Sequence, residues 1–188
     1  MKVEKKKGSW LTWLPSALIL PMFVFNFINL NRNLHLHDPA YVDNANQCTA
    51  QGVIGRYSAA IPHCQASVDW VPDSAQAHYE LGRYLVLDGQ TKAGLKECAK
   101  AVELKPTPSR YANLAMAQAL NNEGDRALKT LQPALADIED HPGRYAEAGM
   151  VYYSLGNRKM AVDCWRKAST RGLPIEKRLA REFMKKYK

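Results

Sequence analysis

A short pattern recurs about every 34 residues along this 188-residue chain, and it constrains the fold more than any other feature. The last copy is the series Tyr145, Gly149, Tyr152, Gly156, Ala161 and Ala168. Shifts of 34 and then 33 residues toward the N-terminus give Tyr111, Ala115, Gln118, Asn122, Ala127 and Ala134, and then His78, Gly82, Leu85, Gly89, Gly94 and Ala101. One further shift of 34 places Gly55, Ala60, Ser67 and Pro72 at the positions of Gly89, Gly94, Ala101 and Pro106. A fixed period of this length indicates a repeat architecture.

Each period has room for two helices. In "AHYELGRYLVL" the apolar residues Leu81, Tyr84 and Leu85 recur at helical spacing, and Gly89 after them favours the end of a helix. Small residues recur where the two helices of a period would cross, which lets the backbones approach closely. A single helix hairpin cannot bury its apolar face, so neighbouring copies must stack. The pattern therefore predicts a curved all-α solenoid.

These residues resemble the tetratricopeptide repeat family, whose unit is a helix hairpin of about 34 residues. The resemblance covers residues 41–174, divided into 41–74, 75–107, 108–141 and 142–174. The first copy is diverged, because its opening segment "YVDNANQCTAQ" is polar and Pro62 falls inside its second helix. The resemblance implies a protein-binding repeat domain, and it says almost nothing about the partner.

The basic charge of the chain lies in its two ends. Residues 1–9 hold four Lys and one Glu, a net +3, and residues 171–188 hold seven Lys or Arg and two Glu, a net +5. Together they account for the formal net charge of +8, so the residues between them are neutral overall. We expect residues 1–9 to be a basic cytoplasmic terminus and 175–188 to form a basic helix that caps the last repeat through Ile175, Leu179 and Phe183.

Residues 10–30, "WLTWLPSALILPMFVFNFINL", contain no charged side chain and are long enough to cross a bilayer as a helix. We interpret them as a single N-terminal transmembrane anchor, followed by a linker over 31–40. A cleaved secretion signal is the alternative, although no small-x-small cleavage site follows before Tyr41. The lysines before the span place the N-terminus in the cytoplasm and the repeats in the periplasm or another extracytoplasmic space. In an organelle outer membrane the repeats could instead face the cytosol.

Three polar or helix-breaking residues inside this span suggest a neighbour in the membrane. Pro15 and Pro21 would kink a helix and free backbone carbonyls, and Asn26 favours a hydrogen-bonding partner over lipid. We expect these residues to contact a membrane protein. A solitary kinked anchor whose asparagines reach the headgroups is the alternative.

Cys48 and Cys64 lie 16 residues apart on the two expected helices of the first repeat, at positions that would face each other. A disulfide between them would hold together a hairpin with few apolar residues, and it requires an oxidising compartment. Two buried thiols are the alternative. Cys98 and Cys164 belong to different repeats, and we expect them to be free.

The first helices of the repeats should line a concave surface that binds a partner. The register places nine candidate residues there or beside it: Tyr79, Arg83, Val86, Leu87, Asn113, Met116, Leu120, Met150 and Tyr153. Their mostly apolar character suits an amphipathic helix or an extended apolar segment. Only Arg83 and Asn113 fit a clamp for a terminal carboxylate, so we do not expect one. The alternative is that these side chains pack within the chain itself.

Catalysis is not expected, because the sequence lacks a phosphate loop, a nucleophile elbow and a zinc signature. His35, His37 and Asp38 in "HLHDP" are a weak metal motif, and we expect no cofactor, no small-molecule substrate and no nucleic acid partner. The sequence thus predicts a membrane-anchored, non-enzymatic scaffold or adaptor that serves as an assembly factor or accessory subunit of a membrane complex. The alternative is a module of polysaccharide or glycan export, with the basic tail binding an acidic polymer.

Overall fold

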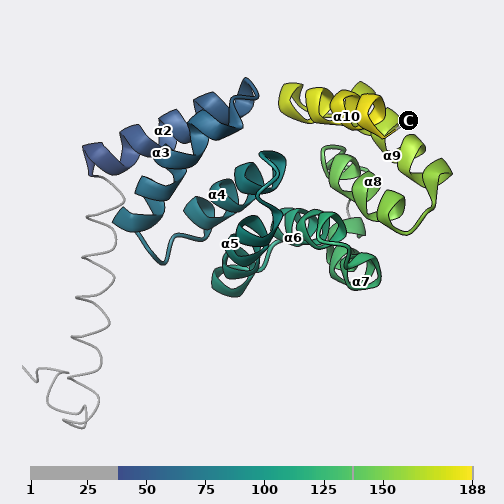
Figure 1. Cartoon of the computed structure of the whole chain (residues 1–188), viewed down its shortest axis with the longest axis horizontal. Coiled ribbons are helices and arrows are strands. Elements are labelled where there is room, and N and C mark those ends of the chain that lie inside the picture. Colours follow the sequence, from purple (N-terminus) through teal and green to yellow (C-terminus); the bar gives the residue numbers. More distant parts are fainter. Residues whose placement is uncertain (1–37, 137, 188) are drawn as a thin grey trace, which may run out of the picture. The chain divides into compact units, whose positions relative to one another are not determined.

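The computed structural model describes residues 38–136 and 138–187, and every helix or strand assigned within those ranges is an α-helix. Figure 1 shows the helices following one another from the α2 end to the C-terminus. They are α2 (Pro39–Val53), α3 (Tyr57–Trp70), α4 (Ala75–Leu87), α5 (Thr91–Leu104), α6 (Pro108–Leu120), α7 (Gly124–Leu135), α8 (Arg144–Ser154), α9 (Arg158–Arg171) and α10 (Pro174–Lys186). Helices α2 to α10 belong to one compact unit.

The helices pair as α2 with α3, α4 with α5, α6 with α7 and α8 with α9. Successive pairs then stack, chiefly through α3 against α4, α5 against α6, and α6 against α8. This arrangement is the stack of helix hairpins that the 34-residue period predicts.

The turn inside each pair requires a left-handed backbone conformation at one position. That position is Gly55, Gly89, Asn122 and Gly156 in the four successive pairs, with φ angles of 86°, 91°, 62° and 77°. Glycine adopts this conformation without steric cost, and asparagine tolerates it better than most residues. The spacing of these four residues is the repeat period itself, so the period is set by where the chain must reverse.

Small residues allow the two helices of a pair to approach closely. A Cβ atom on Gly82 would come within 2.8 Å of the Cys98 backbone nitrogen, and one on Gly94 would meet the Gly82 carbonyl at 2.8 Å. In the last pair, a side chain on Gly149 would overlap the indole of Trp165. The Trp165 Nε1–H group instead donates a hydrogen bond to the Ala146 carbonyl at 3.2 Å.

The apolar core is divided into two clusters. The smaller one joins the first hairpin to α4 and contains Cys48, Ala60, Cys64, Leu81, Tyr84 and Leu85. The larger one runs from Val86 to α10 and includes Met116, Leu131, Trp165, Leu179 and Phe183. Leu179 and Phe183 place the apolar side of α10 against the last pair, where Phe183 and Tyr187 pack among Trp165 and Tyr153.

The transmembrane segment expected at residues 10–30, with Pro15, Pro21 and Asn26, lies outside the described residues. Within 38–136 and 138–187, none of the helices combines the length and the apolar character that a bilayer crossing demands.

Candidate functional site

The inner surface expected to bind a partner is formed by α4, α6 and α8, and five of its nine candidate residues are buried. Arg83, Val86, Asn113, Met116 and Met150 are all buried, with Met116 completely inaccessible. Tyr79, Leu87, Leu120 and Tyr153 are only partly buried. Alanines on α6 and α8 bring these helices close together, so the larger side chains fill the space between them. The five buried residues therefore do not line an open groove in this conformation, which corresponds to the alternative in which the groove is filled by the chain itself.

An ion pair crosses this inner surface from α4 to α8. Arg83 Nη2 lies 3.4 Å from Glu147 Oε1, and only 9% and 6% of the two side chains are exposed. Arg83 Nη1 also donates to the Tyr79 hydroxyl at 2.9 Å. On α6, the Asn113 side-chain amide donates to the Tyr79 carbonyl and to the Cys98 sulfur, each at 3.4 Å. Polar groups from three helices thus meet in the interior.

Burial and neighbouring charge act against each other in this cluster. Burial raises the pKa of Glu147, and the nearby Arg83 opposes that rise. For Arg83, burial works to lower the pKa, but Tyr79 and Glu147 favour the charged form and the net shift is upward. We therefore treat Arg83 as charged at all relevant pH values, with Glu147 as the partner whose charge costs most to bury.

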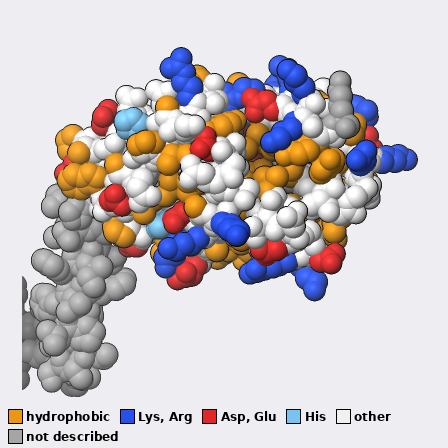
Figure 2. Space-filling model, in the orientation of Figure 1, with side chains coloured by type: hydrophobic (Ala, Val, Ile, Leu, Met, Phe, Trp, Pro, Cys, Tyr) orange, Lys and Arg blue, Asp and Glu red, His pale blue; other side chains and the backbone are white. Residues whose placement is uncertain are grey.

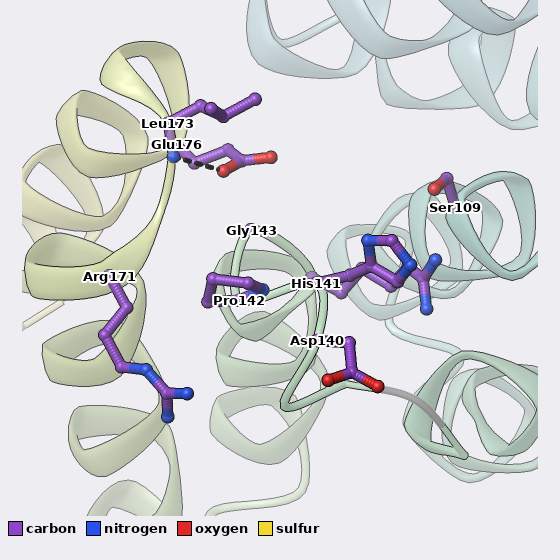
Figure 3. Close-up of a pocket in the computed structure, with 9 residues that line it drawn as sticks. Ser109, Asp140, His141, Pro142, Gly143, Arg171, Leu173 and Glu176 are labelled. Carbon is purple, nitrogen blue, oxygen red and sulfur yellow. Dashed lines mark hydrogen bonds between the residues drawn. The ribbon is translucent and has the colours of Figure 1, made fainter.

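A pocket of about 330 Å³ lies between α6, the start of α8 and the start of α10, and most of the residues that line it are polar or charged. Figure 3 shows Ser109 on one side, His141, Pro142 and Gly143 before α8, and Leu173 and Glu176 on the other side. The Glu176 carboxylate accepts the Leu173 backbone N–H at 2.6 Å and also lies against Gly143, where any side chain would overlap it. The packing of α10 against the segment before α8 therefore forms one wall of the pocket.

The loop between α7 and α8 is tied to α9 by one carboxylate. Glu139 accepts hydrogen bonds from the Tyr145 hydroxyl, from Arg171 at 2.6 Å and from Lys167 at 3.2 Å. The hydrogen bond from Tyr145, followed by those from Arg171 and Lys167, lowers the pKa of Glu139 to about 2. Arg171, which lines the pocket, is therefore already paired with Glu139.

An apolar groove of about 580 Å³ lies between α7, α8 and α9. Its lining is Leu135, Ile138, Tyr145, Ala148, Tyr152, Met160, Asp163, Cys164, Arg166 and Lys167. Met160 on α9 is 41% exposed beside it. Sequence reasoning missed this groove, because the register argument considered only the first helix of each repeat. A signal was present in the sequence, because the connection between α7 and α8 (136–143) is longer than the three- and four-residue connections earlier in the chain.

The cysteines divide into a bonded pair and two thiols. Cys48 and Cys64 form a disulfide with their Cα atoms 5.0 Å apart, and Cys98 and Cys164 are free and buried. Burial raises the pKa of Cys98 to about 12 and that of Cys164 to about 11, so neither is a reactive thiolate.

Among the described residues, no cluster of His, Cys, Asp and Glu side chains has the arrangement of a metal site. Figure 2 shows one face of the molecule, on which basic side chains project mainly at the edges and hydrophobic patches lie between them.

The stacked hairpins, the left-handed turn at each repeat and the helix that follows the last pair together form a fold similar to that of tetratricopeptide repeats. Two solved structures of a protein called MamA have a similar fold, each with a TM-score of 0.52 and 21% sequence identity. One comparison covers 78% of this chain and 87% of MamA, and the other covers 81% and 86%. No family model matches the chain, and a search of curated protein sequences found no match. At this identity the likeness to MamA establishes the fold alone.

Proposed function

We propose that this protein is a non-enzymatic scaffold that binds another protein at a membrane, as an assembly factor or accessory subunit of a membrane complex. The observation that supports binding is the apolar groove between α7, α8 and α9, because the hairpin stack leaves it uncovered beside exposed Met160. An apolar surface of this kind suits a partner's apolar side chains, and methionine adapts to irregular partners. The apolar segment 10–30 would anchor the scaffold, with Pro15, Pro21 and Asn26 contacting the membrane partner.

The groove can be tested with two matched substitutions on α9. Met160 lines the groove and is 41% exposed, whereas Val162 is 37% exposed and does not line it. The full-length protein is extracted from its native membrane in mild detergent, and co-purifying proteins are identified by mass spectrometry. We expect Met160→Glu to lose a partner that Val162→Glu retains, with the same helical circular dichroism for both. Equal recovery with both variants would reject the groove as the contact.

The membrane contribution needs a separate variant in which residues 10–30 are replaced by a polyleucine span. Loss of a stoichiometric membrane partner, with insertion preserved, would support the role of an accessory subunit. Retention of all partners would reject a specific contact by Pro15, Pro21 and Asn26.

Polysaccharide export is the weaker proposal. Of the basic residues on α10, Arg178 is bound to backbone carbonyls of α2, while Arg181 and Lys185 remain exposed. Binding of an acidic polymer to these residues should weaken steeply with added salt, and salt-independent binding would reject this alternative.

A further inference from the structure

The first helix, α2, packs along α3 but buries few of its side chains. Only Cys48 and Gly52 are buried along its length, and Cys48 is bonded to Cys64 of α3. Gly52 packs directly against the Tyr84 ring, where no side chain would fit. Polar contacts add a hydrogen bond between Asn44 and His63 at 3.2 Å. The disulfide therefore adds a covalent link to a helix with little apolar area of its own.

The C-terminal end of α2 is where α10 contacts the first hairpin. Arg178 donates to the carbonyls of Val53 and Gly52, the latter at 3.1 Å, and to the Tyr57 hydroxyl at 3.3 Å. The last carbonyls of a helix have no partner within it and carry partial negative charge, so they suit a guanidinium group. The Tyr57 hydroxyl also donates to Glu182 at 3.5 Å. In Figure 1, α10 approaches the turn between α2 and α3.

This contact consists of polar groups. The apolar residues of α10 belong to the larger core cluster, whereas the first hairpin belongs to the smaller one. Arg178 has its acceptors only while the carbonyls at the end of α2 stay in place. The disulfide helps to hold α2, and therefore these carbonyls, in that position. A cavity of about 60 Å³ between α2 and α4 reaches Cys48 and Cys64, so the packing is already incomplete beside the bond.

We propose that the Cys48–Cys64 disulfide is a redox switch that controls whether α10 is attached to the first hairpin. Cys48 and Cys64 are 2% and 0% exposed, so a reductant reaches their sulfurs only when α2 opens locally. A dithiol reductant then attacks one sulfur as a thiolate and forms a mixed disulfide, and its second thiol releases the protein thiol. Two electrons and two protons pass from the dithiol to Cys48 and Cys64, and the dithiol leaves as a disulfide. The reduced α2 moves away from α3 and α4, the carbonyls of Gly52 and Val53 are withdrawn from Arg178, and α10 loses its contact with the first hairpin.

The test is hydrogen exchange of the full-length protein, measured by mass spectrometry with and without dithiothreitol. Reduction should speed exchange in α2, and it should also speed exchange in the first turns of α10 about tenfold, as expected for the loss of a charge-assisted hydrogen bond. Helices α6 to α9 should remain protected. Cys48→Ser with Cys64→Ser should reproduce the reduced pattern, and dithiothreitol should then change nothing further.

Arg178→Gln releases α10 without opening α2, because it leaves the disulfide intact. In the oxidised variant, α10 should exchange faster while α2 stays protected. Faster exchange of α2 on reduction with α10 unchanged would overturn the proposal, since the two ends would not be coupled. It would equally be overturned if reduction left α2 protected, or if it removed protection from all helices at once.

Discussion

The buried pair of Arg83 and Glu147 permits a quantitative test of what holds the inner surface together. At 3.4 Å, and with an effective dielectric constant near 20, two unit charges attract by about 5 kcal/mol. Because both side chains are more than nine-tenths buried, several kcal/mol per ion is lost through desolvation. The net contribution of the pair is therefore small, whereas breaking it is expensive.

The two single substitutions should differ in cost. Glu147→Leu leaves a buried guanidinium that cannot lose its proton, and we expect it to lower the free energy of unfolding by about 3–5 kcal/mol. Arg83→Met leaves Glu147, whose pKa burial already raises, so the carboxyl can become neutral and the loss should be smaller. A folded-state pKa raised above the unfolded value makes the folded state less stable as the pH rises through it. Arg83→Met should therefore be most stable at acidic pH.

The assay is urea denaturation followed by far-ultraviolet circular dichroism, for the wild type, both single variants and the double variant. The double variant should lie within about 1–2 kcal/mol of the wild type, because no uncompensated charge remains. If the free energy of unfolding falls in the double variant by as much as the two single losses added together, the two residues are not coupled and the reasoning is refuted.

Three further predictions follow from individual contacts. Glu139, with a pKa of about 2 against an ordinary 4.5, should contribute stability that is present above pH 4.5 and lost as the pH falls toward 2. Glu139→Gln should abolish this pH-dependent loss of stability in an acid-denaturation experiment. A pH dependence unchanged from that of the wild type would contradict the role given to Glu139. Gly149→Ala should cost about 1–3 kcal/mol in thermal or urea unfolding, because the new methyl group overlaps Trp165; a neutral result would show that Trp165 can move. Replacing Cys48 and Cys64 by Ala should lower the unfolding free energy by about 3 kcal/mol for a loop of this length, whereas a change below about 1 kcal/mol would mean that the loop is already ordered when unfolded.

The hairpin stack could be predicted from sequence because its signal is local and repeated. Gly55, Gly89, Asn122 and Gly156 mark the reversals, and small residues such as Gly82 mark the crossings. Each of these requirements acts within one repeat, so a single chain shows it several times.

The state of the inner surface could not be predicted in the same way. Whether Met116 faces a groove or a core depends on how closely α6 approaches α8, which is a property of three helices together. The Arg83–Glu147 pair joins residues two repeats apart, and the Arg178 contact spans 125 residues in the sequence. Interactions that occur once, between distant positions, leave no periodic trace.

The contact of Arg178 with the first hairpin also changes how the stability of the domain is distributed. In a linear repeat array each unit interacts only with its neighbours, so the terminal units fray first and unfolding spreads inward. Here the two terminal units support each other through Arg178, Tyr57 and the α2 carbonyls. Local unfolding at either end must therefore break this contact, so the stability of the first hairpin and that of α10 depend on each other. Unfolding should then be more cooperative than in a linear array with the same number of repeats.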